Sequence, residues 1–125
     1  MRYRIFASLV LLTVCLLPLR ANAQHPAGFA PCVNATGAFT IAVTGSSANQ
    51  LLTHCGPSVL LMNIGTQELF YQIGTTSSTA ATTSSYSLPG NSYILLTVSQ
   101  IGTTYIAAIT STSTTTLRIS QGTAQ

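Results

Sequence analysis

Charged side chains are almost missing from this chain. Its 125 residues include four arginines and one glutamate, and lysine, aspartate and tryptophan are absent. Three of the arginines lie in the first 20 residues, so only Glu68 and Arg118 carry formal charge beyond them. Nucleic-acid binding needs clustered Lys and Arg that displace counterions from phosphates, and an electrostatic membrane anchor needs a basic cluster as well. The charge content excludes both.

Acid and base pairs are equally scarce. Glu68 is the only acid, and His25 and His54 are the only histidines. General acid–base catalysis uses paired titratable groups, and a Ser–His–acid arrangement would need both Glu68 and His54. Phosphate-binding loops and nucleophile elbows are absent. We therefore expect no enzyme, no catalytic residue and no cofactor, with an exported hydrolase as a weaker alternative.

The first 23 residues have the three parts of a cleavable secretory signal peptide. A basic start, Met1 to Arg4, precedes a mostly apolar run from Ile5 to Leu17, and Ala21-Asn22-Ala23 supplies the small residues of a cleavage site. The apolar run is shorter than the ~20 residues that span a bilayer. We expect residues 1–23 to be removed, the mature chain to begin at Gln24 outside the cytoplasm, and no membrane attachment to remain.

Cysteine is present three times, and Cys15 lies in the leader. Cys32 and Cys55 remain, and in an oxidising compartment such a pair forms a disulfide by default. Closing a loop of about 24 residues would stabilise the fold by roughly 3 kcal/mol. Free thiols are one alternative. A metal site with His25 and His54 is another, although an adjacent His54-Cys55 lacks the usual ligand spacing.

Hydroxyl side chains take the place of charge. Thr and Ser make up 32 of the 102 residues after the leader, and threonine favours strands because its branched Cβ fits a pleated surface. Apolar residues alternate with small or polar ones at Phe39, Ile41 and Val43, as in a half-buried strand. The more continuous apolar run over 58–64 predicts a central strand, and 67–73 alternates again.

Turn signals divide the chain into short segments. Asn63 to Thr66 predicts a hairpin turn, and Leu88-Pro89-Gly90-Asn91 is a strong turn signal. The pattern predicts an all-β fold, a small antiparallel β-sandwich or barrel of six to seven short strands. We expect an extended N-terminal arm over 24–37 and a single β domain over 38–125.

Candidate partner contacts lie around residues 74–85. This Thr/Ser/Ala stretch has no bulky residue and is predicted to be an exposed loop that begins near Thr75 and Thr76. Tyr86 and Tyr93 flank the Pro-Gly turn, where they form either a contact patch or a packed corner.

Several segments from residue 59 to 122 match a known pattern. They are the Leu61–Thr66 turn of the form apolar-x-N-x-G-T, the strand end Phe70–Gly74, the Leu88–Asn91 turn, and segments 104–110 and 115–122. In these the chain resembles small tailed-phage virion proteins of the head-decoration or minor structural kind. The resemblance implies a passive β-domain associated with a virion and supplies no catalytic residues.

The expected function is that of a non-enzymatic, exported structural protein, periplasmic or extracellular, that contacts a protein partner or assembles with itself. The alternative is a secreted or periplasmic binding module for carbohydrate or a cell-surface partner, which would use the 74–85 loop and the nearby tyrosines.

Overall fold

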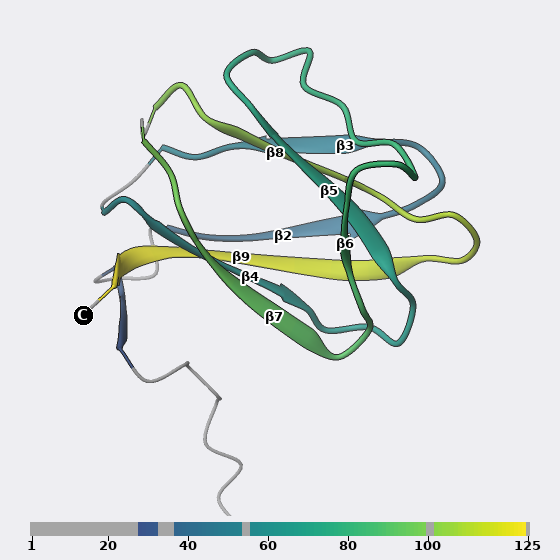
Figure 1. Cartoon of the computed structure of the whole chain (residues 1–125), viewed down its shortest axis with the longest axis horizontal. Coiled ribbons are helices and arrows are strands. Elements are labelled where there is room, and N and C mark those ends of the chain that lie inside the picture. The colour runs from purple at the N-terminus through teal and green to yellow at the C-terminus, as the bar shows by residue number, and fades with distance from the viewer. Residues whose placement is uncertain (1–27, 33–36, 54–55, 100–101, 125) are drawn as a thin grey trace, which may run out of the picture.

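A computed structural model describes residues 28–32, 37–53, 56–99 and 102–124. These residues form nine β-strands in two antiparallel sheets that pack face to face (Figure 1), which confirms the predicted all-β sandwich. The described ranges contain no helix, and hence none that could cross a membrane. The strands are β1 (Phe29–Pro31), β2 (Ala38–Val43), β3 (Ala48–Leu51), β4 (Ser58–Asn63), β5 (Leu69–Gly74), β6 (Tyr86–Leu88), β7 (Ser92–Thr97), β8 (Tyr105–Ile109) and β9 (Thr115–Ala124).

Strand β9 is the centre of the first sheet. Its ten residues pair with β4 along one edge and with β2 and then β1 along the other. Strand β7 pairs with the far side of β4 and ends this sheet among the described residues. The second sheet has the order β3-β8-β5-β6.

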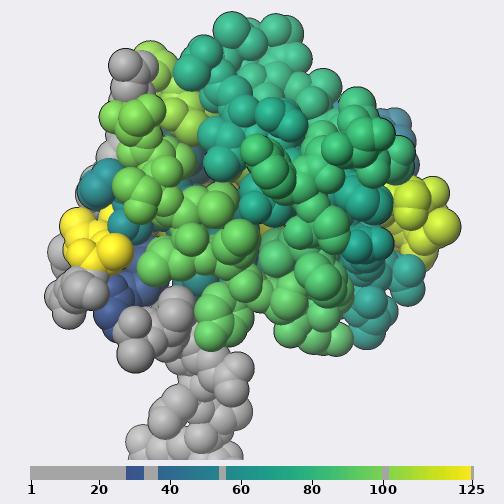
Figure 2. Space-filling model, in the orientation of Figure 1, coloured from purple at the N-terminus to yellow at the C-terminus, as the bar shows by residue number. Residues whose placement is uncertain are grey.

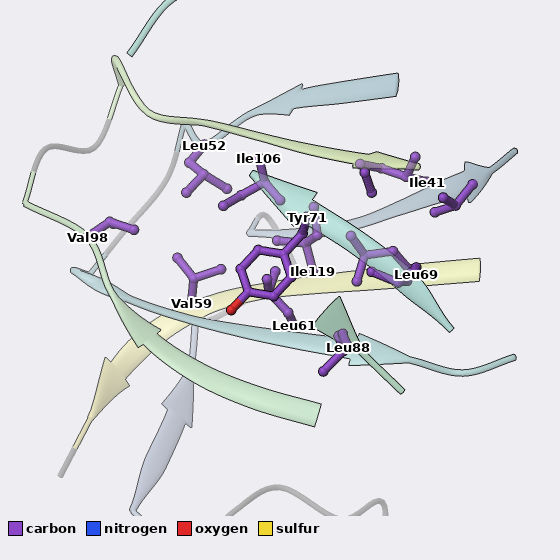
Figure 3. Close-up of a cluster of buried hydrophobic side chains, with 13 residues drawn as sticks. Ile41, Leu52, Val59, Leu61, Leu69, Tyr71, Leu88, Val98, Ile106 and Ile119 are labelled. Carbon is purple, nitrogen blue, oxygen red and sulfur yellow. The ribbon is translucent and has the colours of Figure 1, made fainter. Parts of the chain in front are cut away.

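The core lies between the two sheets, where the inward side chains of both meet (Figure 3). The alternation predicted for Phe39, Ile41 and Val43 is confirmed, because all three face this core. The Tyr71 ring lies among the core side chains, between the sheets (Figure 3). Burying one such aliphatic or aromatic side chain stabilises the fold by about 1.5–3 kcal/mol. The buried cluster comprises Ile41, Val43, Leu52, Val59, Leu61, Leu69, Tyr71, Leu88, Val98, Ile106, Ala108, Leu117 and Ile119.

The described residues form nine strands, more than the six to seven predicted, and the strands that were missed are short. β1, β3 and β6 have three or four residues each, which is too short for a period of two to show in the sequence. β1 falls within the predicted extended arm over 24–37, and it pairs with the end of β9.

The predicted hairpin at 63–66 is wrong. β4 lies in the first sheet and β5 in the second, so the turn between them carries the chain across the core. The cause is Asn63, which is 1% exposed and turns its amide inward. Ile64 still donates its N–H to the Thr116 carbonyl (3.0 Å), so the chain leaves β9 only after this residue.

The Asn63 amide nitrogen joins two turns to the end of β4. Its Nδ2 donates to the carbonyl oxygens of Gln67 (2.6 Å), Leu88 (3.1 Å) and Pro89 (3.1 Å). These carbonyls belong to the turn before β5 and to the junction of β6 with β7. A buried carbonyl without a donor costs free energy, so the one amide group stabilises the ends of three strands.

The side-chain oxygen of Asn63, Oδ1, bonds to the same group of strand ends and turns, which we call the Asn63 corner. It accepts hydrogen bonds from the Gly65 N–H (3.3 Å) and from the hydroxyl of Thr115 (2.8 Å), the first residue of β9. The two turns also touch directly, because the Asn91 N–H donates to the Gly65 carbonyl (2.8 Å). A Cβ at Gly90 would overlap the Thr66 carbonyl, so only glycine fits there.

Asn63→Asp tests this corner. The substitution keeps the shape but replaces the donating nitrogen by a second acceptor oxygen, which would face three carbonyl oxygens. We expect the free energy of unfolding in urea to fall by about 3 kcal/mol, the range for a buried polar group that loses its partners.

Asn49→Asp is the matched control. Asn49 also donates its Nδ2 to two carbonyls, those of Ser77 and Thr79, but at an exposed site. There we expect a loss below about 1 kcal/mol. Equal losses for the two variants would contradict the role given to Asn63.

Candidate functional site

The predicted contact tyrosines are both on the surface. The side chain of Tyr86 on β6 is 65% exposed and that of Tyr93 on β7 is 49% exposed. Tyr86 lies in the second sheet and Tyr93 in the first, so their use as partner contacts stays a prediction.

Tyr86 and Tyr71 lie side by side at the edge of the second sheet. They are paired residues of β6 and β5, with ring centroids 5.6 Å apart and planes tilted by 32°. Burial raises the pKa of Tyr71 above its ordinary value of 10.0, and the negative charge that Tyr86 gains on ionising raises it further. The exposed ring of Tyr86 thus contacts a buried core side chain, that of Tyr71.

The two predicted threonine contacts lie elsewhere. Thr75 and Thr76 are exposed and follow the last residue of β5. Thr75 comes four residues after Tyr71, about 13 Å farther along the strand direction. The structure therefore does not bring the threonines and the tyrosines into one patch.

The 75–85 loop is exposed along most of its length, as predicted, but it is held against β3. The Asn49 amide donates to the carbonyls of Ser77 (2.9 Å) and Thr79 (3.0 Å), and the Ala81 N–H donates to the Ser47 hydroxyl (2.8 Å). Ala81 is 3% exposed. These anchors fix both the early and the middle part of the loop on the second sheet.

An apolar strip, not foreseen from the sequence, lies on the outer face of the first sheet. Because Val59, Leu61, Ile94 and Leu96 face the core, their neighbours in β4 and β7 face outward. These neighbours form two cross-strand pairs. Of the four, Leu60 is buried, Met62 and Leu95 are half-buried, and Tyr93 is exposed. We call Leu60, Met62, Tyr93 and Leu95 the apolar strip; the signal for it was the lack of alternation in both segments.

Residues able to support chemistry are dispersed. Glu68 lies on the surface just before β5, and its carboxylate accepts a hydrogen bond from the Ser87 hydroxyl. The described part of the chain holds no group of three or more His, Cys, Asp or Glu side chains arranged for a metal ion. His25, His54 and Cys55 lie outside the described residues.

Cys32 directly follows β1, and its sulfur is half of a disulfide. Its N–H donates to the Gln121 carbonyl in β9 (3.0 Å). Gly56 approaches the same end of β9, since a Cβ there would overlap the Gly122 carbonyl. Cys32 and Gly56 therefore lie at the same end of β9, on its two opposite edges. The partner sulfur itself is not among the described residues, so the Cys32–Cys55 pairing stays a prediction.

No family model, curated protein or solved structure matches the chain. The resemblance to phage virion proteins rests on the sequence segments named above. The surface features that could contact a partner are the apolar strip, the exposed tyrosines and the edges of the two sheets.

Tyr71 gives this region a pH dependence. Its pKa is raised in the folded state, so the fold holds its proton more tightly than the unfolded chain does. The stabilisation is fully present below pH ~10 and is lost as the pH rises through the folded-state pKa. In a spectrophotometric titration of the mature chain we expect Tyr71→Phe to remove a component above pH 10 and Tyr86→Phe to shift that component to lower pH. A titration curve unchanged in shape by Tyr71→Phe would contradict the assignment.

Proposed function

We propose that this protein is a non-enzymatic, exported structural protein that works by assembling with copies of itself. The observation that carries the proposal is the apolar strip on the outer face of the first sheet, on β4 and the end strand β7. Within the strip Tyr93 is exposed and Met62 and Leu95 are half-buried, and exposed apolar surface favours contact with another protein. The leader-like first 23 residues support export, and the resemblance to virion proteins supports an association with a particle built of many copies.

The charge balance favours contact between identical chains. After the leader, one glutamate and one arginine remain, which gives a formal balance of zero. Net charge keeps proteins apart in solution, and a chain near zero net charge associates more readily. Two copies of this protein therefore approach one another with little electrostatic repulsion.

A carbohydrate-binding or surface-binding module is the second candidate. The 65% exposed ring of Tyr86 favours it, because a tyrosine joins an apolar face to a hydrogen-bonding hydroxyl. Its separation from Thr75 and Thr76 counts against a single site that would use all the predicted contacts.

Size-exclusion chromatography with light scattering tests the proposal on oxidised residues 24–125. Over a concentration series we expect dimers or larger species whose share rises with concentration. A monomer at every concentration that binds glycans, with loss of that binding in Tyr86→Ala, would contradict self-assembly and favour the second candidate.

Export predicts that the disulfide has formed in the native protein. We expect no free thiol in the denatured mature chain, and we expect reduction to lower the free energy of unfolding by roughly 3 kcal/mol. Thiol labelling followed by mass mapping identifies the pair. Two reactive thiols at Cys32 and Cys55 in protein purified from its native compartment would argue against this part of the proposal.

A further inference from the structure

Strand β7 is an open edge of the first sheet. One side of it pairs with β4 over six residues in unbroken register, and its other side has no strand partner in the described ranges. The green residues of β7 lie at the surface that faces the viewer in Figure 2. An open edge presents unpaired N–H and C=O groups that pair readily with another strand.

The register shows which groups are free. Val98 donates its N–H to the Pro57 carbonyl (2.7 Å), which continues the β4–β7 ladder by one pair. In an antiparallel ladder every second residue bonds to the neighbour, so the residues between point their backbone groups away from β4. These are Tyr93, Leu95 and Thr97, whose side chains all lie on the outer face.

The β4–β9 ladder gives an independent check. Ile64 donates to Thr116, so the even-numbered residues of β4 bond to β9 and the odd-numbered ones are left for β7. Those odd residues pair with Leu96, Ile94 and Ser92 of β7. Both ladders therefore assign the same three residues to the open edge.

Two features that protect edge strands are missing from β7. Its sequence, Ser-Tyr-Ile-Leu-Leu-Thr, contains no charge and no proline, and these are two of the devices by which edge strands avoid pairing. Ile94 and Leu96 on the inner face and Leu95 on the outer face are apolar. A strand of this kind favours a neutral, apolar strand as its partner.

We propose that the partner is β7 of a second copy, paired antiparallel about a two-fold axis at Leu95. This deepens the proposed function, on which it rests, by naming the interface. In this register Leu95 lies opposite Leu95 of the second copy, Tyr93 opposite Thr97, and Ile94 opposite Leu96. Each chain donates three N–H groups and accepts at three carbonyls, so every free group of the edge is used.

The residues of β7 are compatible with one another in this register. Leucine lies opposite leucine at the axis, Ile94 lies opposite Leu96, and the Thr97 hydroxyl lies opposite Tyr93, so no charged group enters the pairing. The pairing also extends the apolar strip, because Leu60 and Leu95 are cross-strand partners and Leu95 continues to Leu95 and Leu60 of the second copy. Neither β4 nor β7 contains a charged residue, so these strands bring no like charges together across the axis.

The opposite edge of the same sheet offers a matched control. Gln121 donates to the Gly37 carbonyl (2.8 Å), so in β2 the free backbone groups belong to Ala38, Thr40 and Ala42. Thr40 is exposed and lies mid-strand on the outer face, as Leu95 does, but its cross-strand partner is Arg118 and not a leucine. Its neighbours on the same face, Ala38 and Ala42, offer little apolar area to a second copy.

A charge exchange at residue 95 tests the inference. We expect Leu95→Lys and Leu95→Glu each to weaken dimerisation of residues 24–125 by at least about tenfold, because like charges directly opposite destabilise a strand pair. An equimolar mixture of the two variants should restore the dimer. Thr40→Lys and Thr40→Glu should leave the dimer unchanged. Sedimentation velocity gives the association constants, and circular dichroism checks that each variant is folded.

Thr97→Lys covers the case in which residue 95 variants fail to fold. Thr97 is exposed, so a lysine there is tolerated by the monomer, and at the interface it would face Tyr93 of the second copy. We expect it to weaken the dimer and to leave the unfolding midpoint of the monomer unchanged.

The outcomes separate the two proposals. If residues 24–125 are monomeric at all concentrations, the proposed function and this interface are both wrong. If the protein self-associates but the substitutions at 95 and 97 leave association unchanged, the β7 interface is wrong and self-assembly stands. Loss of association in all the variants, the Thr40 control included, would also overturn the assignment to β7.

Discussion

The buried amide of Asn63 is the interaction on which the arrangement of the two sheets depends. It lies where β4 ends, and it bonds to the turn that enters β5, to the end of β6 and to the start of β9. Strands of both sheets therefore meet at one side chain. Because the bond to Pro89 also fixes the turn before β7, the position of the open edge follows from the same group.

A buried amide with several hydrogen bonds selects one arrangement of the strands among several that would bury a similar apolar area. An apolar side chain at residue 63 could pack in many ways, whereas a buried amide must find donors and acceptors in one geometry. The turns close to it are correspondingly tight: the Asn91 backbone is left-handed, with φ of 54°, and Gly90 lies against the Thr66 carbonyl. The Leu88–Asn91 segment was a strong turn signal in the sequence, and it contains the Gly90 and Asn91 that this turn requires.

The sequence was enough to predict the fold class and most of the strands, because alternation at residues such as Phe39, Ile41 and Val43 reflects a face that must be buried. It could not show that β4 and β5 lie in different sheets. A turn of the form Asn-Ile-Gly-Thr fits a hairpin as well as a crossing, and the difference lies in where the Asn63 side chain points. β1, β3 and β6 were missed because strands of three or four residues leave no period to detect.

The candidate site was predictable in part. Tyr86 and Tyr93 were found as exposed aromatics, but Thr75 and Thr76 were grouped with them by sequence distance, although β5 carries them to its other end. The apolar strip and the open edge depend on which face and which side of each strand is occupied, and such facts come from sheet pairing. A run of apolar residues such as 93–96 is the only trace that they leave in the sequence.

Amide hydrogen exchange resolved by residue is the most direct test of this account. In dilute solution the N–H groups of Tyr93, Leu95 and Thr97 should exchange fast, while those of Ile94 and Leu96 stay protected through β4. At high concentration the first three should become protected as well, with no comparable change at Thr40 in β2. Equal protection of all five of these amides at every concentration, or fast exchange of the first three even when the protein is concentrated, would contradict the assignment of β7 as a self-pairing edge.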